Sequence, residues 1–167
     1  MAIHVEAFGG EKGLEIAELA KGLLGDNTAV PVLSLVAVKG DVPVGHIVFT
    51  KARLTGAGNV VSARILAPLA VLPDEQAQGT GGQLIEEGLR QLRESGVDLV
   101  FVLGHPEYYP RHGFVSAGDL GYEAPYPIPE EDAEAWMVQE LHPGYAGKAR
   151  GEVQCCEVLD QPQHWRE

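Results

Sequence analysis

The chain has 167 residues, with 24 acidic against 12 basic side chains and a formal net charge of −12. This length suits one domain, residues 1–167, and the negative field repels phosphate backbones, so we predict no nucleic-acid partner. No apolar run reaches the ~18 residues of a membrane span, and the start lacks the regions of a signal peptide. We therefore expect no membrane partner and a cytoplasmic location.

Helices and strands alternate irregularly from the N-terminus. Apolar residues at helical spacing predict a helix over Glu11–Leu24. Two β-branched-rich runs, Leu33–Val38 and Val44–Thr50, flank turn residues and predict an antiparallel hairpin. A longer apolar stretch, Val60–Val71, contains Pro68, which cannot donate to a strand ladder. Pro68 therefore marks an edge, a bulge or a point where strands part.

The second half of the chain predicts one amphipathic helix and three strands, which are Gln83–Glu94, Val97–Leu103, Trp136–Leu141 and Glu152–Leu159. The order of elements lacks regular βαβ alternation, which favours an α+β domain over a doubly wound one. The class predicted is mixed α/β. The adjacent cysteines Cys155 and Cys156 form no CxxC motif, and we predict no metal site.

A glycine-dense connection, Gln76–Gly82, lies between a predicted strand and the helix that follows. Glycines let backbone N–H groups turn toward a phosphate, and a helix N-terminus adds partial positive charge. Glycines inside the helix cost ~1 kcal/mol each, an expense with little structural motive. The Gly-Lys-Ser/Thr of a P-loop and the third glycine of a dinucleotide loop are both missing from this segment. The pattern predicts an anion site of another kind.

Three segments together resemble one family. Gln76-x-x-Gly79-x-Gly81-x-x-Leu84 resembles the acetyl-CoA signature of the GNAT superfamily of acetyltransferases. Upstream, Leu69-Ala70-Val71 with Pro73 matches the strand before that loop. Downstream, Tyr109-x-x-x-Gly113-Phe114 looks like the Tyr-x-x-x-Gly-Phe segment in the form of the YhbS-like branch.

The resemblance implies a GNAT-like fold, in which a mixed and splayed central sheet is flanked by helices. The family's first edge strand would be missing, since His4–Gly10 looks like the end of the family's first helix. The cosubstrate implied is acetyl-CoA. Backbone groups around the loop would bind its pantetheine and pyrophosphate, and the cofactor-binding residues implied are Leu69, Ala70, Val71, Gln76, Gln78, Gly79, Thr80, Gly81 and Gly82.

In this family the acceptor amine attacks the thioester directly within a ternary complex. A CoA thiolate resembles a cysteine thiolate of pKa ~8.5, so a neutral phenol can protonate it. The resemblance assigns this role to Tyr109, whereas Tyr108 is expected to pack elsewhere. For the base, His46 is one candidate beside the alternatives His105, Glu107, His112 and an ordered water.

The function predicted is transfer of an acetyl group from acetyl-CoA to a primary amine of a small molecule. Two alternatives stay open: a protein or peptide N-acetyltransferase, and a non-catalytic sensor that binds acyl-CoA. The loop specifies the donor, and variable loops build the acceptor site, so the acceptor is not predicted. A missing first strand would leave an open sheet edge, which motivates the hypothesis of a homodimer.

Overall fold

The structure is a computed structural model that describes residues 2–55, 61–142 and 151–165. The α-helices of these ranges are α1 (Ala2–Phe8), α2 (Gly10–Leu24) and α3 (Thr80–Glu94). The strands are β1 (Leu33–Lys39), β2 (Val42–Leu54), β3 (Ala63–Val71), β4 (Leu99–Leu103), β5 (Val115–Ser116), β6 (Tyr122–Glu123), β7 (Trp136–Glu140) and β8 (Gly151–Gln154). None of the helices described is both long and apolar enough to cross a membrane.

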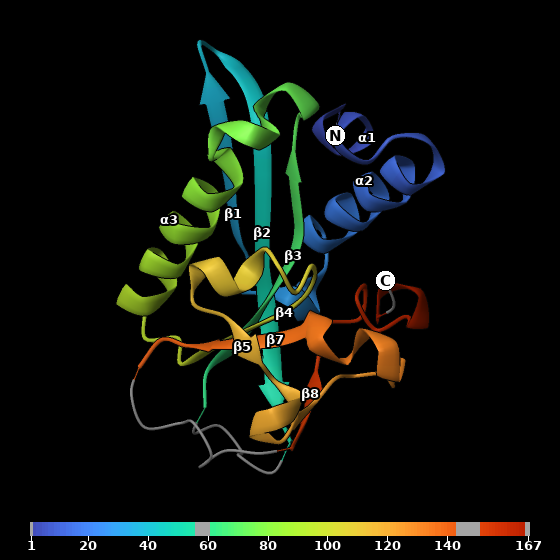
Figure 1. Cartoon of the computed structure of the whole chain (residues 1–167), viewed down its shortest axis with the longest axis vertical. Coiled ribbons are helices and arrows are strands. Elements are labelled where there is room, and N and C mark those ends of the chain that lie inside the picture. The colour runs from blue at the N-terminus through green and yellow to red at the C-terminus, as the bar shows by residue number, and fades with distance from the viewer. Residues whose placement is uncertain (1, 56–60, 143–150, 166–167) are drawn as a thin grey trace.

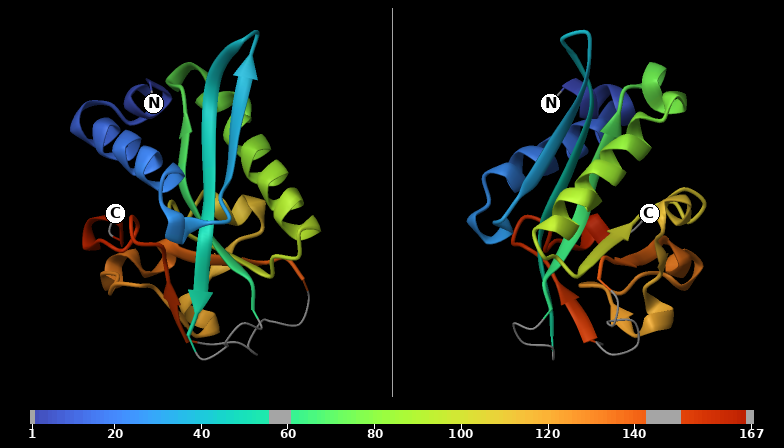
Figure 2. Two further views of the ribbon diagram at one scale, coloured as in Figure 1. Left: turned by 180° about the vertical axis from the view of Figure 1, so that it is seen from behind. Right: turned by 90° about the vertical axis from the view of Figure 1, so that its left-hand side faces the viewer.

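The strands form one mixed sheet in the order β5-β7-β4-β3-β2-β8-β6, with β1 beside β2. β3 and β4 are parallel, as are β6 and β8, and the other neighbours are antiparallel. Helices α1 and α2 lie on one side of β1–β3 and α3 lies on the other (Figures 1 and 2). The structure confirms the mixed α/β class.

The molecule has one hydrophobic core on each face of the sheet. Strand β2 contributes to both, because its side chains alternate between the two faces. Ile47 and Phe49 pack with the apolar face of α3, whereas Val48 packs with Leu19 and Leu23 of α2. Each helix thus covers one face of the same strand. Gly88 of α3 lies directly over the Phe49 ring, so a Cβ at this position would overlap the ring.

The sheet opens between β3 and β4. These strands pair only from Ala63–Leu99 to Ile65–Phe101, after which β3 continues to Val71 without a partner on that side among the described residues. In Figure 1, β1–β3 run along the long axis, whereas β7 runs crosswise to them. The predicted splay is therefore present.

A bulge in β3 lies within this splayed part. Ile47 of β2 pairs with Leu69 and Phe49 pairs with Leu66, so two residues of β3, Ala67 and Pro68, lie opposite Val48 alone. Pro68 thus occupies a bulge where the strands part, as its missing N–H predicts.

Helix α1 spans the first residues that the structure describes, Ala2–Phe8. The helices α1 and α2 pack closely at Gly13. A Cβ on this residue would lie only 2.7 Å from the Val5 carbonyl oxygen. Glycine at this position permits the contact.

Several element bounds differ from the sequence prediction, among them those of β2, which runs over Val42–Leu54 where Val44–Thr50 was predicted. Helix α3 begins at Thr80, three residues earlier than predicted, and β3 begins at Ala63, while Val60 lies outside the described residues. Strand β8 ends at Gln154, because the backbone N–H groups beyond it bond to side chains near η1 (Asn27–Ala29). The N–H of Glu157 donates to Thr28 Oγ1 at 2.9 Å, so this segment cannot continue a strand ladder.

Candidate active site

The N-terminus of α3 has the geometry of an anion site. Gly79 precedes the helix in the left-handed conformation (φ 81°, ψ 7°), with open space where a Cβ would be, and no side chain caps the helix. The first N–H groups of a helix lack intrahelical partners and carry its positive dipole end. Thr80, Gly81 and Gly82 contribute these groups, so an anionic group can bind here through the backbone alone.

The loop before α3 is tied to the sheet by its side chains. It forms the short helix η2 (Pro73–Gln78). The Gln76 side-chain amide donates to the Val71 carbonyl oxygen at 2.9 Å, and Glu75 Oε1 lies 3.1 Å from Lys39 Nζ. Gln78 is exposed beside Gly79. The Gln76 side chain therefore braces the loop against the end of β3.

The end of β3 forms the wall of the site. Leu69, Ala70 and Val71 pair with β2 on one side and lie beyond the point where β4 departs on the other. Thr80 is buried, and its methyl group lies 3.2 Å from the position of a Cβ at Gly45. The start of α3 is thus packed against β2, next to the open stretch of β3.

Tyr109 belongs to the core beside the site. It opens the short helix η3 (Tyr109–His112) and is only 8% exposed. Its ring meets Phe114 edge to face at 5.7 Å, and a Cβ at Gly104 would overlap it. Gly104 at the end of β4 therefore fixes the ring of Tyr109.

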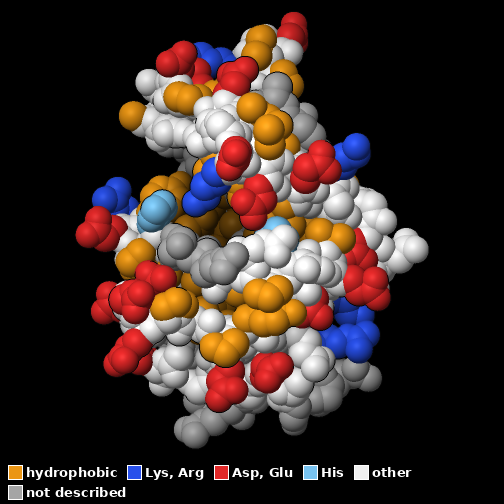
Figure 3. All heavy atoms as spheres, turned by 90° about the vertical axis from the view of Figure 1, so that its right-hand side faces the viewer, with side chains coloured by type: hydrophobic (Ala, Val, Ile, Leu, Met, Phe, Trp, Pro, Cys, Tyr) orange, Lys and Arg blue, Asp and Glu red, His pale blue; other side chains and the backbone are white. Residues whose placement is uncertain are grey.

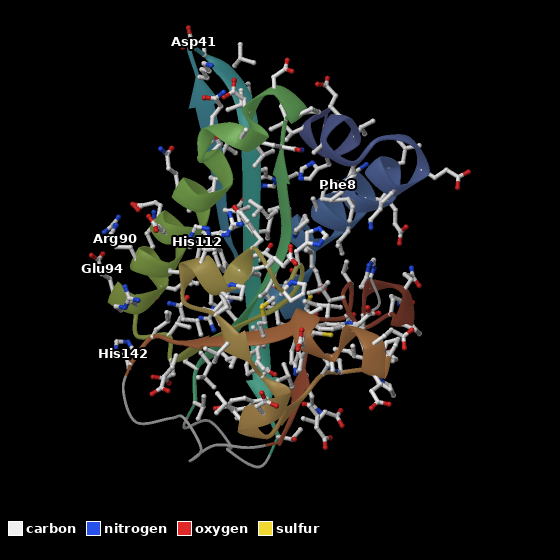
Figure 4. The ribbon with its side chains drawn as sticks, viewed as in Figure 1. Phe8, Asp41, Arg90, Glu94, His112 and His142 are labelled. Carbon is white, nitrogen blue, oxygen red and sulfur yellow. The ribbon has the colours of Figure 1, made fainter. Side chains whose placement is uncertain are left out.

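Two other side chains of the same segment touch the glycine loop itself. A Cβ at Gly81 would lie 2.6 Å from the Tyr108 hydroxyl oxygen, and a Cβ at Gly82 would lie 2.9 Å from His112 Cε1. Figure 4 shows His112 beside α3. The sequence interpretation that these glycines have little structural motive is therefore wrong for Gly81 and Gly82, because Gly81 makes room for Tyr108 and Gly82 makes room for His112.

His46 is buried under α1 with a partner at each ring nitrogen. Its Nε2 lies 2.7 Å from Ser34 Oγ and its Nδ1 lies 3.0 Å from His4 Nε2. Burial, aided by the neighbouring His4, lowers the pKa of His46 to about 4. Its side chain is thus neutral at pH 7 and held in a fixed network.

The remaining candidates for the base lie apart from that network. His105 and Glu107 are exposed, and His112 is half-buried, with Nδ1 3.9 Å from a Glu86 oxygen. Within the described ranges, no three His, Cys, Asp or Glu side chains gather closely enough to hold a metal ion. The site therefore offers a phenol, imidazoles and backbone amides.

The face that carries α1, α2 and the C-terminal segment is hollowed at its centre (Figure 3). Hydrophobic side chains line the floor of this hollow, and charged side chains of both signs stand near its rim. A small ligand with an apolar body and a charged end suits such a surface.

Sequence reasoning missed that the Tyr108 side chain contacts the glycine loop at Gly81. The signal was present in the glycines: adjacent small residues at a helix start admit a ring from elsewhere in the fold as readily as a phosphate. Which of the two neighbouring tyrosines reaches the loop depends on the backbone of η3, and one sequence does not specify that.

Comparison with known proteins agrees with this geometry. Residues 1–117 match the family described as "Acetyltransferase (GNAT) domain". The uncharacterized N-acetyltransferase YjhQ of Escherichia coli K12 is 51% identical over 140 residues, which cover 83% of this chain and 76% of that protein. The uncharacterized N-acetyltransferase YhbS of the same strain is 38% identical over 76 residues, which cover 46% of this chain and 44% of that protein.

Two solved structures share the fold over nearly the whole chain. YhbS from Escherichia coli in complex with CoA has a TM-score of 0.83 at 27% identity and covers 96% of this chain and 84% of that one. A GNAT acetyltransferase from Brucella melitensis in complex with acetyl-CoA has a TM-score of 0.72 at 28% identity, covering 95% and 88%. The chain belongs to the GNAT family of acetyltransferases and resembles its YhbS-like members.

Proposed function

We propose that this protein transfers the acetyl group of acetyl-CoA to a primary amine of a small molecule. The observation that carries the proposal is the uncapped N-terminus of α3, with open space at Gly79, beside the stretch of β3 from which β4 has separated. The CoA and acetyl-CoA complexes of the two similar structures support the same ligand here. A cytoplasmic location stays a prediction.

The proposed site has two parts. Backbone amides from Gln76 to Gly82 bind the pyrophosphate, helped by the dipole of α3. The pantetheine arm runs along Leu69–Val71 toward the gap between β3 and β4. The Val71 carbonyl already accepts from Gln76, so the arm bonds chiefly to the other backbone groups of this stretch.

In the proposed reaction, the amine nitrogen attacks the thioester carbonyl carbon and the C–S bond breaks. Tyr109 gives its phenolic proton to the departing thiolate and regains one from solvent. The fixed partners and low pKa of His46 do not favour it as a direct base. We therefore favour an ordered water as the acceptor of the ammonium proton. His46 stays the alternative candidate for the general base.

Calorimetric titration with acetyl-CoA tests the cofactor site. Gly79→Asp and Gly79→Asn carry the same backbone strain and nearly the same volume, and they differ in charge. We expect the Asp variant to bind about tenfold more weakly than the Asn variant, or ~1.4 kcal/mol. Gly40→Asp, another left-handed and open position on the β1–β2 turn, is the control. A wild-type protein that does not bind acetyl-CoA would overturn the proposal.

An amine screen then tests the acceptor. Release of CoA with small primary amines supports the proposal, and turnover of peptides alone would support the protein acetyltransferase instead. Tight binding with no turnover across both panels would favour a sensor that binds acyl-CoA. The hollow in Figure 3 supports a small acceptor, because its apolar floor and charged rim suit a compact amine.

The edge of β1 supports the proposal of a homodimer. β1 pairs only with β2 among the described strands, and Lys39 is its one charged residue. Val36 and Val38 on this strand are more than half exposed. Edge strands usually carry more charge, so this one is suited to pair with a second copy. A purely monomeric sedimentation profile at micromolar concentration would exclude the dimer.

A further inference from the structure

The Tyr108 hydroxyl reaches from the η3 segment to the first turn of α3. It lies 2.6 Å from the position that a Cβ would take on Gly81, and Val71 Cγ2 lies 3.7 Å from the same point. Three parts of the chain, the end of β3, the start of α3 and the entry to η3, therefore meet at this hydroxyl.

The neighbouring tyrosine occupies a different place. Tyr109 is buried against Gly104 and Phe114, whereas Tyr108 is half-buried and crosses the Tyr109 ring edge to face at 5.2 Å. The two tyrosines are thus neighbours in sequence, but their side chains lie in different environments. Tyr109 packs in the core, and Tyr108 borders the glycine loop.

The Tyr108 hydroxyl is available as a donor. It makes no hydrogen bond to any of the residues described by the structure. Burial raises the pKa of Tyr108, with Arg111 acting against it, so the phenol keeps its proton at neutral pH. A half-buried O–H without a protein acceptor is costly unless a ligand or water accepts from it.

We infer that Tyr108 is a cofactor-binding residue whose hydroxyl donates a hydrogen bond to the pyrophosphate of acetyl-CoA, beside the backbone amides of Gly81 and Gly82. This inference rests on the proposed function. The amides and the hydroxyl meet at one turn of α3, so a phosphate that binds the helix N-terminus comes within reach of the phenol. The missing Cβ at Gly81 then leaves room for the hydroxyl.

Titration of Tyr108→Phe with CoA and with 3′-dephospho-CoA tests the inference. The Phe variant keeps the ring and loses the donor, so CoA should bind about tenfold more weakly, while thermal stability without ligand stays close to wild type. The same factor is expected for 3′-dephospho-CoA, which retains the pyrophosphate. Tyr126→Phe, whose hydroxyl donates to the distant Asp160 carbonyl, should bind CoA as wild type does.

A second variant tests the contact at Gly81. Gly81→Ala pushes the hydroxyl away, whereas in Gly81→Ala/Tyr108→Phe the nearest ring atom, Tyr108 Cζ, is an ordinary 3.7 Å from the new methyl group. The double variant should therefore bind CoA as Tyr108→Phe does. A further tenfold loss in the double variant would mean that the two positions act independently, which contradicts the inference.

Three results separate this inference from the proposed function. Unchanged CoA affinity in Tyr108→Phe would overturn the inference while leaving the acetyltransferase intact. A loss with CoA that vanishes with 3′-dephospho-CoA would also overturn it, since the contact would then be to the 3′-phosphate. Failure of the wild type to bind CoA would instead overturn the proposed function.

Discussion

The Nδ1 atom of His46 lies 3.0 Å from Nε2 of His4, and the two buried rings meet edge to face at 81°. The pair joins β2 to α1, and Ser34 of β1 extends it at the other ring nitrogen of His46. A buried polar contact of this kind fixes the position of α1 on the sheet. Burial of each imidazole costs free energy unless a hydrogen bond replaces its contacts with water, so the two rings must stay in contact. The charge state of His46 therefore bears on the stability of the fold.

Stability should fall as the pH drops from about 6.5 to about 4. Burial lowers the pKa of His46 to about 4, so the unfolded chain takes up a proton in this window before the folded chain does. The stability from neutral His46 is full above pH 6.5, and at most about 3 kcal/mol of it is lost by pH 4. Urea unfolding at several pH values measures this loss.

The variant His46→Gln isolates the effect of this side chain. Its unfolding free energy should vary less between pH 6.5 and 4 than that of the wild type, whereas His105→Gln, at an exposed position, should keep the wild-type slope. Equal slopes in wild type and His46→Gln would contradict the assignment.

Replacement of Tyr109 by Phe should lower kcat about 100-fold, the scale of a lost general acid, once an acceptor amine is in hand. Acetyl-CoA affinity should stay within about twofold of wild type, because the ring remains packed between Gly104 and Phe114. Single-turnover kinetics and calorimetry measure the two quantities separately. A kcat equal to that of wild type would remove Tyr109 from the mechanism.

The substitution Gly88→Ala should destabilise the protein by about 1–3 kcal/mol, although alanine favours helices. A Cβ at this position would overlap the ring of Phe49, which is fully buried under α3. Gly118→Ala is the matched control, since nothing lies within 4 Å of its Cβ position and it should be neutral. Partial recovery in Gly88→Ala/Phe49→Leu would identify the clash as the cause, and the absence of any recovery would argue against it.

Asp26→Ala should release the segment that follows β8. The Asp26 carboxylate accepts from the Thr28 N–H at 2.7 Å and from the Val158 N–H at 2.9 Å. Burial alone would raise the pKa of Asp26, but bonds from Thr28 and Val158 outweigh it and hold the pKa below its usual value. Loss of these bonds should cost about 2–3 kcal/mol.

Hydrogen exchange measures this release through the amides of Glu157 and Val158, which should exchange faster in Asp26→Ala than in the wild type. Because the pKa is lowered, the wild-type stabilisation is present above the unfolded pKa and lost as pH falls through the folded one. Asp119→Ala, at an exposed position, should show neither change. Equal exchange in wild type and Asp26→Ala would show that the segment is held elsewhere.

Local patterns predicted the elements that have strong periodicity. The helix predicted over Glu11–Leu24 was confirmed to within one residue, and the hairpin of β1 and β2 was confirmed, although β2 extends to Leu54. Pro68 predicted the place where the sheet opens, because a residue without an N–H cannot pair on both sides. The end of β8 was not predictable, since Asp26 and Thr28, over 100 residues away in sequence, bond to the backbone there.

The sequence by itself determined the family and the glycine-rich start of α3, because glycine spacing and helix polarity are local properties. Tertiary structure alone decided what surrounds each site residue. It buried His46 beside His4, enclosed the ring of Tyr109 and brought the Tyr108 hydroxyl to Gly81. Burial and contact depend on how distant segments pack, and a pattern of neighbours along one chain does not contain that information.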